Sequence, residues 1–182
     1  MRILGIDPGS TATGFGVVDA SGDRIVHVAH GTVRPRREGS PAVRLQFLYA
    51  AMADVIAEYR PDVAVVEQVF VAASPRSALV LGQARGVVLA ALAAGDLGVT
   101  EYSATQIKQG VTGSGRAGKR QVQLMVRRLL DLDRVPPSDA SDALAAAIRH
   151  AGASRLAAVG VALPRRRRAA RQGLSVRVRP NP

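Results

Sequence analysis

Cysteine is absent from this 182-residue chain, so disulfides and metal sites built from thiolates are excluded. No apolar run is both long and uninterrupted, which predicts that no segment spans a bilayer. A secretory signal is not expected either, because Asp7 interrupts the first apolar stretch. With 47% apolar residues and a mean hydropathy near zero, the composition predicts a soluble protein that is cytoplasmic and has no membrane partner.

Acidic residues are missing from the C-terminal end of the chain. Residues 1–150 hold 17 Lys+Arg and all 14 Asp+Glu, a net charge of +3, whereas residues 151–182 hold eight Arg and no acid, a net charge of +8. We expect one domain over residues 1–152 and a basic, disordered tail over residues 153–182. Such tails usually bind polyanions, although a genomic bias toward arginine would produce the same excess.

The pattern of apolar residues and turn residues predicts alternating strands and helices. Strands are expected at residues 3–6, 13–18, 24–33, 62–67 and 99–102, and helices at residues 41–60, 74–94, 105–109, 119–130 and 138–150. Three sequential strands followed by crossovers predict an α/β fold, a mixed sheet flanked by helices. If the first and fourth strands lie parallel and adjacent, Asp7 and Glu67 meet at their carboxyl ends, where such sheets bind ligands.

Two further acids, Asp139 and Asp142, lie three residues apart at the start of the last predicted helix and therefore share one face. They could simply be first-turn acids that favour the helix dipole, with Ser138 as the N-cap, and this alternative stays open. If instead they overhang Asp7 and Glu67, four carboxylates converge. Their mutual repulsion would then have to be neutralised by divalent cations. All-oxygen ligands suit Mg²⁺, or Mn²⁺ as a substitute, and two such ions serve phosphodiester hydrolysis.

Six motifs in order along residues 1–150 resemble the RuvC family of Holliday-junction resolvases, which are metal-dependent nucleases with an RNase H-like fold and a five-stranded mixed sheet. They are Ile-Leu-Gly-Ile-Asp-Pro-Gly from Ile3, Val-Val-Glu-Gln-Val-Phe ending at Phe70, Ser-Ala-Leu-Val-Leu-Gly-Gln-Ala-Arg-Gly ending at Gly86, Gln-Ile-Lys-Gln-Gly-Val-Thr-Gly from Gln106, Lys-Arg-Gln-Val-Gln from Lys119, and Asp-Ala-Ser-Asp-Ala-Leu-Ala from Asp139.

The resemblance implies which residues act. The implied metal-binding and catalytic set is Asp7, Glu67, Asp139 and Asp142. Lys108 and Lys119 are implied to be catalytic, positively charged residues that contact phosphate in the scissile region. These are the only two lysines in a chain with 23 arginines, and Lys and Arg are not interchangeable beside a phosphate. Phe70 corresponds to a family aromatic that stacks on bases, although a core position is equally compatible, and Arg76 is a further DNA-binding candidate. The chain departs from the family pattern at Val71–Ser74, which puts the details of junction contact in question.

The expected activity is resolution of four-way DNA junctions by paired symmetric nicks that leave 5′-phosphate and 3′-hydroxyl ends, in recombination and repair. A symmetric substrate favours a homodimer, and Gly82 and Gly86 make the helix at residues 74–94 the candidate interface. The family also implies a branch-migration helicase complex as partner. His150 is expected to cap the last helix rather than to act in catalysis.

Three other functions fit some of these features. An ATPase of the actin and sugar-kinase type has a similar phosphate loop but needs a second domain. A non-catalytic junction-binding module would gain from losing the four mutually repelling acids. Another RNase H-like nuclease, acting on RNA–DNA hybrids, would not need the segments around Lys108 and Lys119.

Overall fold

The computed structural model describes residues 1–182 except 10, 36–38, 69–73, 159 and 161–182. Its centre is one five-stranded sheet in the order β3-β2-β1-β4-β5, in which β1–β2 and β2–β3 are antiparallel and β1–β4 and β4–β5 are parallel. The strands are β1 (Arg2–Asp7), β2 (Thr13–Ser21), β3 (Arg24–Val33), β4 (Val63–Gln68) and β5 (Gly98–Ser103). The predicted α/β class and the parallel pairing of the first and fourth strands are confirmed.

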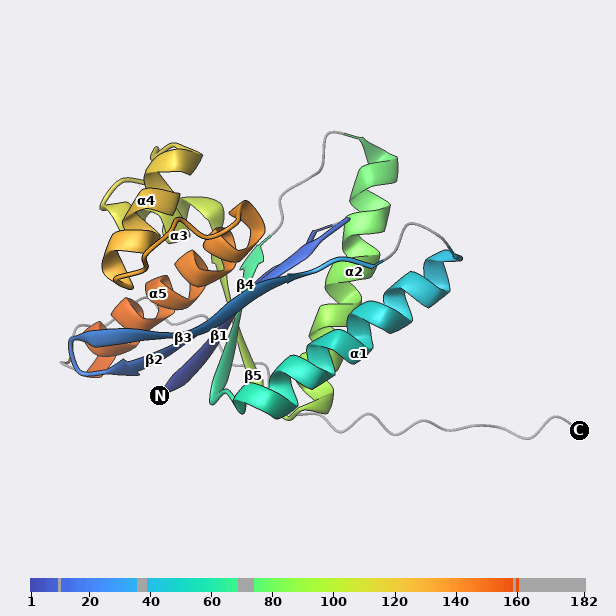
Figure 1. Cartoon of the computed structure of the whole chain (residues 1–182), viewed down its shortest axis with the longest axis horizontal. Helices are drawn as coiled ribbons and strands as arrows, with labels where there is room; N and C mark the ends of the chain where they lie inside the picture. The colour runs from blue at the N-terminus through green and yellow to red at the C-terminus, as the bar shows by residue number, and fades with distance from the viewer. Residues whose placement is uncertain (10, 36–38, 69–73, 159, 161–182) are drawn as a thin grey trace, which may run out of the picture.

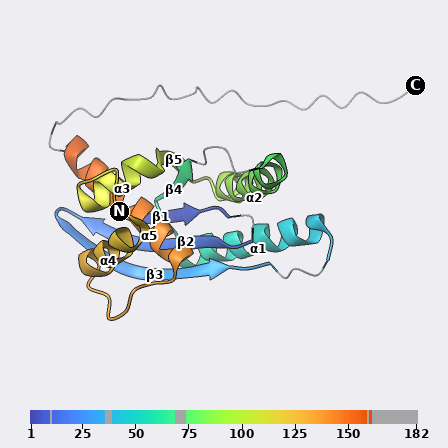
Figure 2. The ribbon, with the colours of Figure 1, turned by 90° about the horizontal axis from the view of Figure 1, so that it is seen from above.

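Five helices complete the described part of the chain: α1 (Pro41–Tyr59), α2 (Pro75–Ala94), α3 (Ala104–Thr112), α4 (Lys119–Leu129) and α5 (Ser138–Ala158). Figure 1 shows α3, α4 and α5 gathered on one side of the sheet and α1 and α2 on the other, and Figure 2 shows the same division from above. The apolar core is therefore split into two layers by the sheet.

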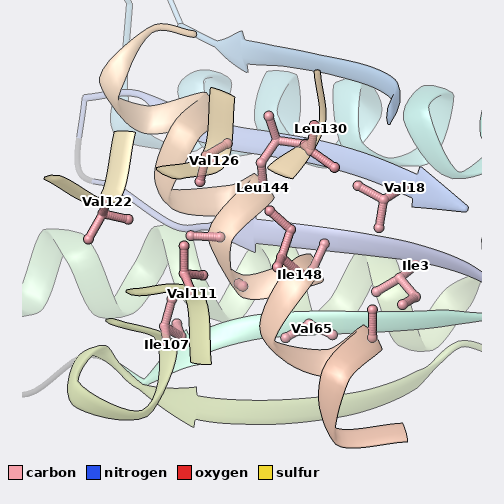
Figure 3. Close-up of a cluster of buried hydrophobic side chains, with 14 of the residues drawn as sticks. Ile3, Val18, Val65, Ile107, Val111, Val122, Val126, Leu130, Leu144 and Ile148 are labelled. Atoms are coloured by element: carbon pink, nitrogen blue, oxygen red, sulfur yellow. The ribbon is translucent and has the colours of Figure 1, made fainter. Parts of the chain in front are cut away.

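One layer of the core lies between the sheet and α5. Figure 3 shows Ile3 and Val65 of the sheet facing Leu144 and Ile148 of α5, with side chains of α3 and α4 closing the cluster. All of α5 from Ala143 to Ile148 is buried, as its unbroken apolar sequence requires. This helix is held against the strands over its whole first half, and that fixes where its first turn lies.

The last helix is longer than the sequence pattern indicates. It continues from the expected end at His150 to Ala158, and the buried Ala151 and Ala153 pack it against the core. The expected domain boundary at residue 152 thus falls inside a helix. The predicted capping role of His150 is wrong: this side chain lies in mid-helix, where its Nδ1 is 3.1 Å from the Tyr102 hydroxyl, and burial lowers its pKa.

Helix α2 is unusually apolar for its position. It is the one described helix that is long and apolar enough, by length and composition alone, to cross a membrane, although Arg76 and Arg85 interrupt its apolar sequence. One side of it packs in the core through Ala84, Val88 and Leu92, whereas Leu79 is 65% exposed. The guanidinium of Arg85, in the middle of this helix, pairs with Glu101 of β5, so α2 belongs to the cover of the sheet.

Candidate active site

Strand alternation places Asp7 and Glu67 on the same face of the sheet. In β1, Ile3 lies in the core layer under α5 and Leu4 in the opposite layer, so Asp7 points to the α5 side. In β4, Val65 is on the α5 side, and so is Glu67. The parallel register pairs Ile6 with Val66, which leaves the two acids as neighbours one residue further on.

Glycines let the first turn of α5 sit directly over these strand ends. A Cβ atom at Gly14 of β2 would overlap the carbonyl oxygen of Asp139, and one at Gly5 of β1 would overlap the carbonyl oxygen of Ala143. Glycine inside a strand often marks such a close approach of another backbone. Asp139 and Asp142 are thereby brought to the α5-side face of the sheet, beside Asp7 and Glu67.

Burial and neighbouring negative charge act on the two strand acids, Asp7 and Glu67. The pKa of Asp7 is raised to about 7, first by burial and then by the charges of Glu67, Asp142 and Asp139. The pKa of Glu67 is also raised, by burial and then by Asp142, while Lys108 and Lys119 oppose the effect. Asp139 lies in the first turn of α5, where a negative charge also favours the helix dipole. The charges of Asp139 and Asp142 nevertheless act on Asp7 as well.

The two lysines approach the acids from α3 and α4. Lys119 is the first residue of α4, where a cation is unfavourable for the helix dipole, and its Nζ lies 3.1 Å from Asp142 Oδ2. Burial would lower the Lys119 pKa, but the hydrogen bond and charge of Asp142 raise it overall. A cleft of about 220 Å³ is lined by Lys108, Lys119, Glu67 and Asp142. The six residues predicted to be catalytic therefore come together, and their catalytic roles stay a prediction.

Two arginines at the site were not recognised in the sequence. Arg34, just after β3, places its Nη2 2.9 Å from Asp139 Oδ2. Arg85 of α2 donates from Nη1 to the backbone carbonyl of Glu67 at 2.9 Å and pairs with Glu101. Neither contact has a sequence signal, because the partners are far apart along the chain in an arginine-rich background.

The remaining DNA-binding candidates are less constrained. Arg76 is exposed in the first turn of α2. Phe70 and Val71–Ala73 lie outside the described residues, so the stacking role of Phe70 stays a prediction.

The donor set fits divalent metal. Carboxylate oxygens are the ligands that Mg²⁺ and Mn²⁺ prefer, and the Asp7 pKa is raised by burial and then by the neighbouring negative charges, which a cation would offset. In this structure, however, the described residues contain no group of three or more acidic or histidine side chains arranged to hold an ion. Asp139 and Asp142 are each engaged by a cationic side chain instead.

Comparison with known proteins gives a consistent result. A family model described as "Crossover junction endodeoxyribonuclease RuvC" matches residues 3–150. The crossover junction endodeoxyribonuclease RuvC of Ralstonia pickettii is 50% identical over 178 residues, which cover 97% of each chain. The Thermus thermophilus RuvC structure superposes with a TM-score of 0.79 at 34% identity, covering 86% of this chain and 97% of that one. The same bacterium's RuvC in complex with Holliday junction substrate gives 0.78 at 32% identity, covering 88% and 98%.

Proposed function

The chain belongs to the RuvC family of crossover junction endodeoxyribonucleases, and on that premise we propose how its own residues resolve a four-way DNA junction. The family that the sequence motifs resemble is thus confirmed, and with it the nuclease activity in recombination and repair. The substrate is the Holliday junction, the ligand named for the Thermus thermophilus relative. The observation that carries the site proposal is the meeting of two strand-end acids with two acids of α5.

In this proposal Asp7, Glu67, Asp139 and Asp142 hold two Mg²⁺ ions, for which Mn²⁺ substitutes. When bound, the ions would supply the positive charge that activates the attacking water and stabilises the leaving 3′ oxygen. Asp7 comes from the end of β1, and Asp139 and Asp142 come from the start of α5, which is packed on the same strands. The cut leaves a 5′-phosphate and a 3′-hydroxyl.

Lys108 and Lys119 bind the non-bridging oxygens of the scissile phosphate. Both line the cleft that also contains Glu67 and Asp142, so a phosphate there meets both signs of charge. Lys119 pairs with Asp142 in the structure, and its ammonium would be free to contact the phosphate if Asp142 served as a metal ligand, because a flexible point charge needs no fixed geometry. Arg85 holds the end of β4 in place through the Glu67 carbonyl.

Two identical sites are needed to nick two strands symmetrically, so the working form is a homodimer. A Cβ at Gly82 or Gly86 would meet no atom of the described chain within 4 Å, so tight packing inside the chain does not explain these glycines. The exposed apolar side of α2, which includes Leu79, supports this helix as the interface. The proposed partner, a branch-migration helicase complex, comes from the family resemblance, and the proposed cytoplasmic location comes from the composition.

The test is cleavage of a synthetic four-way junction with Mg²⁺ or with chelator, by wild type, Asp7→Asn and the control Asp54→Asn. Asp54 is exposed on α1 and carries the same charge change away from the site. We expect symmetric nicks in Mg²⁺ for wild type and control, and binding without nicking for Asp7→Asn. Nicking by wild type in chelator would refute the metal dependence, and full activity of Asp7→Asn would refute its role.

A further inference from the structure

Each α5 acid of the site is paired with a cation from a different element. Asp142 pairs with Lys119 from the start of α4, and Asp139 pairs with Arg34 from the end of β3. Lys119 already has an expected role at the phosphate. Arg34 has none, and it is not among the residues that line the cleft.

The Arg34–Asp139 contact is the kind of pair that can open. The Arg34 side chain is 61% exposed and the Asp139 side chain 30%, and the distance of 2.9 Å is that of a charge-assisted hydrogen bond. Exposed pairs of this kind are individually weak. A divalent cation carries twice the charge of the guanidinium and competes for the same oxygen.

The contact also has a reason to exist in the metal-free protein. Asp139 raises the pKa of the buried Asp7, so its negative charge acts on the centre of the site. The guanidinium of Arg34, on Oδ2 of Asp139, offsets part of that charge. It also occupies Oδ2, one of the two oxygens that Asp139 would offer an ion, and in this arrangement no three acids of the described chain are set to bind one.

We propose that Arg34 is a positioning residue that pairs with Asp139 in the metal-free protein. A divalent ion that binds Asp139 displaces the Arg34 guanidinium. This inference rests on the proposed function, because it assumes that Asp139 is a metal ligand. In this role Arg34 lowers the affinity of the site for metal and takes no part in catalysis. Removal of its charge should therefore tighten metal binding, whereas removal of a structural support would weaken it.

The probe is Mn²⁺ alone, without DNA, titrated into the full-length protein and followed by the electron paramagnetic resonance of the free ion. We expect Arg34→Gln to bind Mn²⁺ about three- to tenfold more tightly than wild type, the range expected when a partly exposed ion pair no longer competes. Arg34→Lys keeps the charge and should restore an affinity close to that of wild type.

The matched control is Arg155→Gln. Arg155 lies toward the other end of α5, is 52% exposed and pairs with Asp23 at 2.9 Å, so this variant loses the same charge and a similar ion pair away from the site. It should leave Mn²⁺ affinity within about twofold of wild type, because distant exposed charges are screened.

The outcomes separate the two proposals. Unchanged or weaker Mn²⁺ binding by Arg34→Gln, with normal binding by wild type, would overturn the role of Arg34 and leave the metal site standing. Equal tightening in Arg155→Gln would also overturn it, since net charge alone would then explain the effect. If neither wild type nor Arg34→Gln binds Mn²⁺, the proposed metal site fails and the inference with it.

Discussion

Replacing Asp7 by asparagine should stabilise the metal-free protein while abolishing its nuclease activity. A carboxyl group whose pKa moves from 3.8 to about 7 on folding is destabilised when ionised. At about 1.4 kcal/mol for each tenfold change in the ionisation constant, the penalty reaches at most about 4 kcal/mol above neutral pH. Asparagine keeps the shape of the side chain and carries no charge, so it removes most of that penalty.

The sign of the effect depends on pH in a defined way. Because the Asp7 pKa is raised in the folded state, that state binds a proton more tightly than the unfolded chain does. The wild type therefore loses stability through this group as pH rises from about 4 to about 7, and no further above that. The advantage of Asp7→Asn should be close to zero near pH 4, grow through pH 5 and 6, and level off near pH 7.

The measurement is urea unfolding of wild type and Asp7→Asn in chelator at pH 4.5, 6 and 8, with Asp54→Asn as control. We expect a gain of about 2–4 kcal/mol at pH 8 for Asp7→Asn and less than about 0.5 kcal/mol for the exposed control. Adding Mg²⁺ should stabilise wild type more than Asp7→Asn, because an ion that binds only the folded state shifts the equilibrium toward it. A variant that is less stable than wild type at pH 8, or a difference that does not shrink toward pH 4.5, would refute the reasoning.

Three further predictions follow from the packing and charge of the chain. Gly14→Ala should lower the free energy of unfolding by about 1–3 kcal/mol and stop nicking, because the added Cβ would overlap the Asp139 carbonyl. The control is Gly152→Ala, whose added Cβ would meet no atom of the described chain. It should be neutral or stabilising in the same urea assay. Gly82→Leu should weaken dimerisation, and an unchanged sedimentation velocity profile would refute α2 as the interface. Deleting residues 161–182 removes seven arginines and should flatten the salt dependence of junction binding; an identical slope of log affinity against log salt would exclude a role for the tail in DNA affinity.

The sequence was informative where a residue's chemistry and its place in a periodic element agree. Asp7 and Glu67 each end a short β-branched or aliphatic run, so their meeting at one sheet edge follows from parallel pairing alone. The end of α5 could not be predicted in this way. The small residues after His150 are compatible both with a buried helix and with an exposed segment, so they do not indicate where the helix ends. The cap role given to His150 failed for the same reason: the helix did not stop there.

The contacts that set the site's geometry were hidden for a different reason. Arg34 and Asp139 are separated by 105 positions, and nothing local distinguishes Arg34 from the other arginines of the chain. The glycines were readable in principle: Gly5, Gly14 and Gly16 interrupt strands whose other positions are filled by packed side chains, and each faces α5. A strand glycine that faces a covering helix indicates how near that helix comes, and hence how close the acids of that helix lie to those of the sheet. This packing buries Asp7 and brings the other acids near it, and both effects raise the Asp7 pKa. The packing that builds the site therefore lowers the stability of the metal-free protein at neutral pH, where Asp7 must ionise.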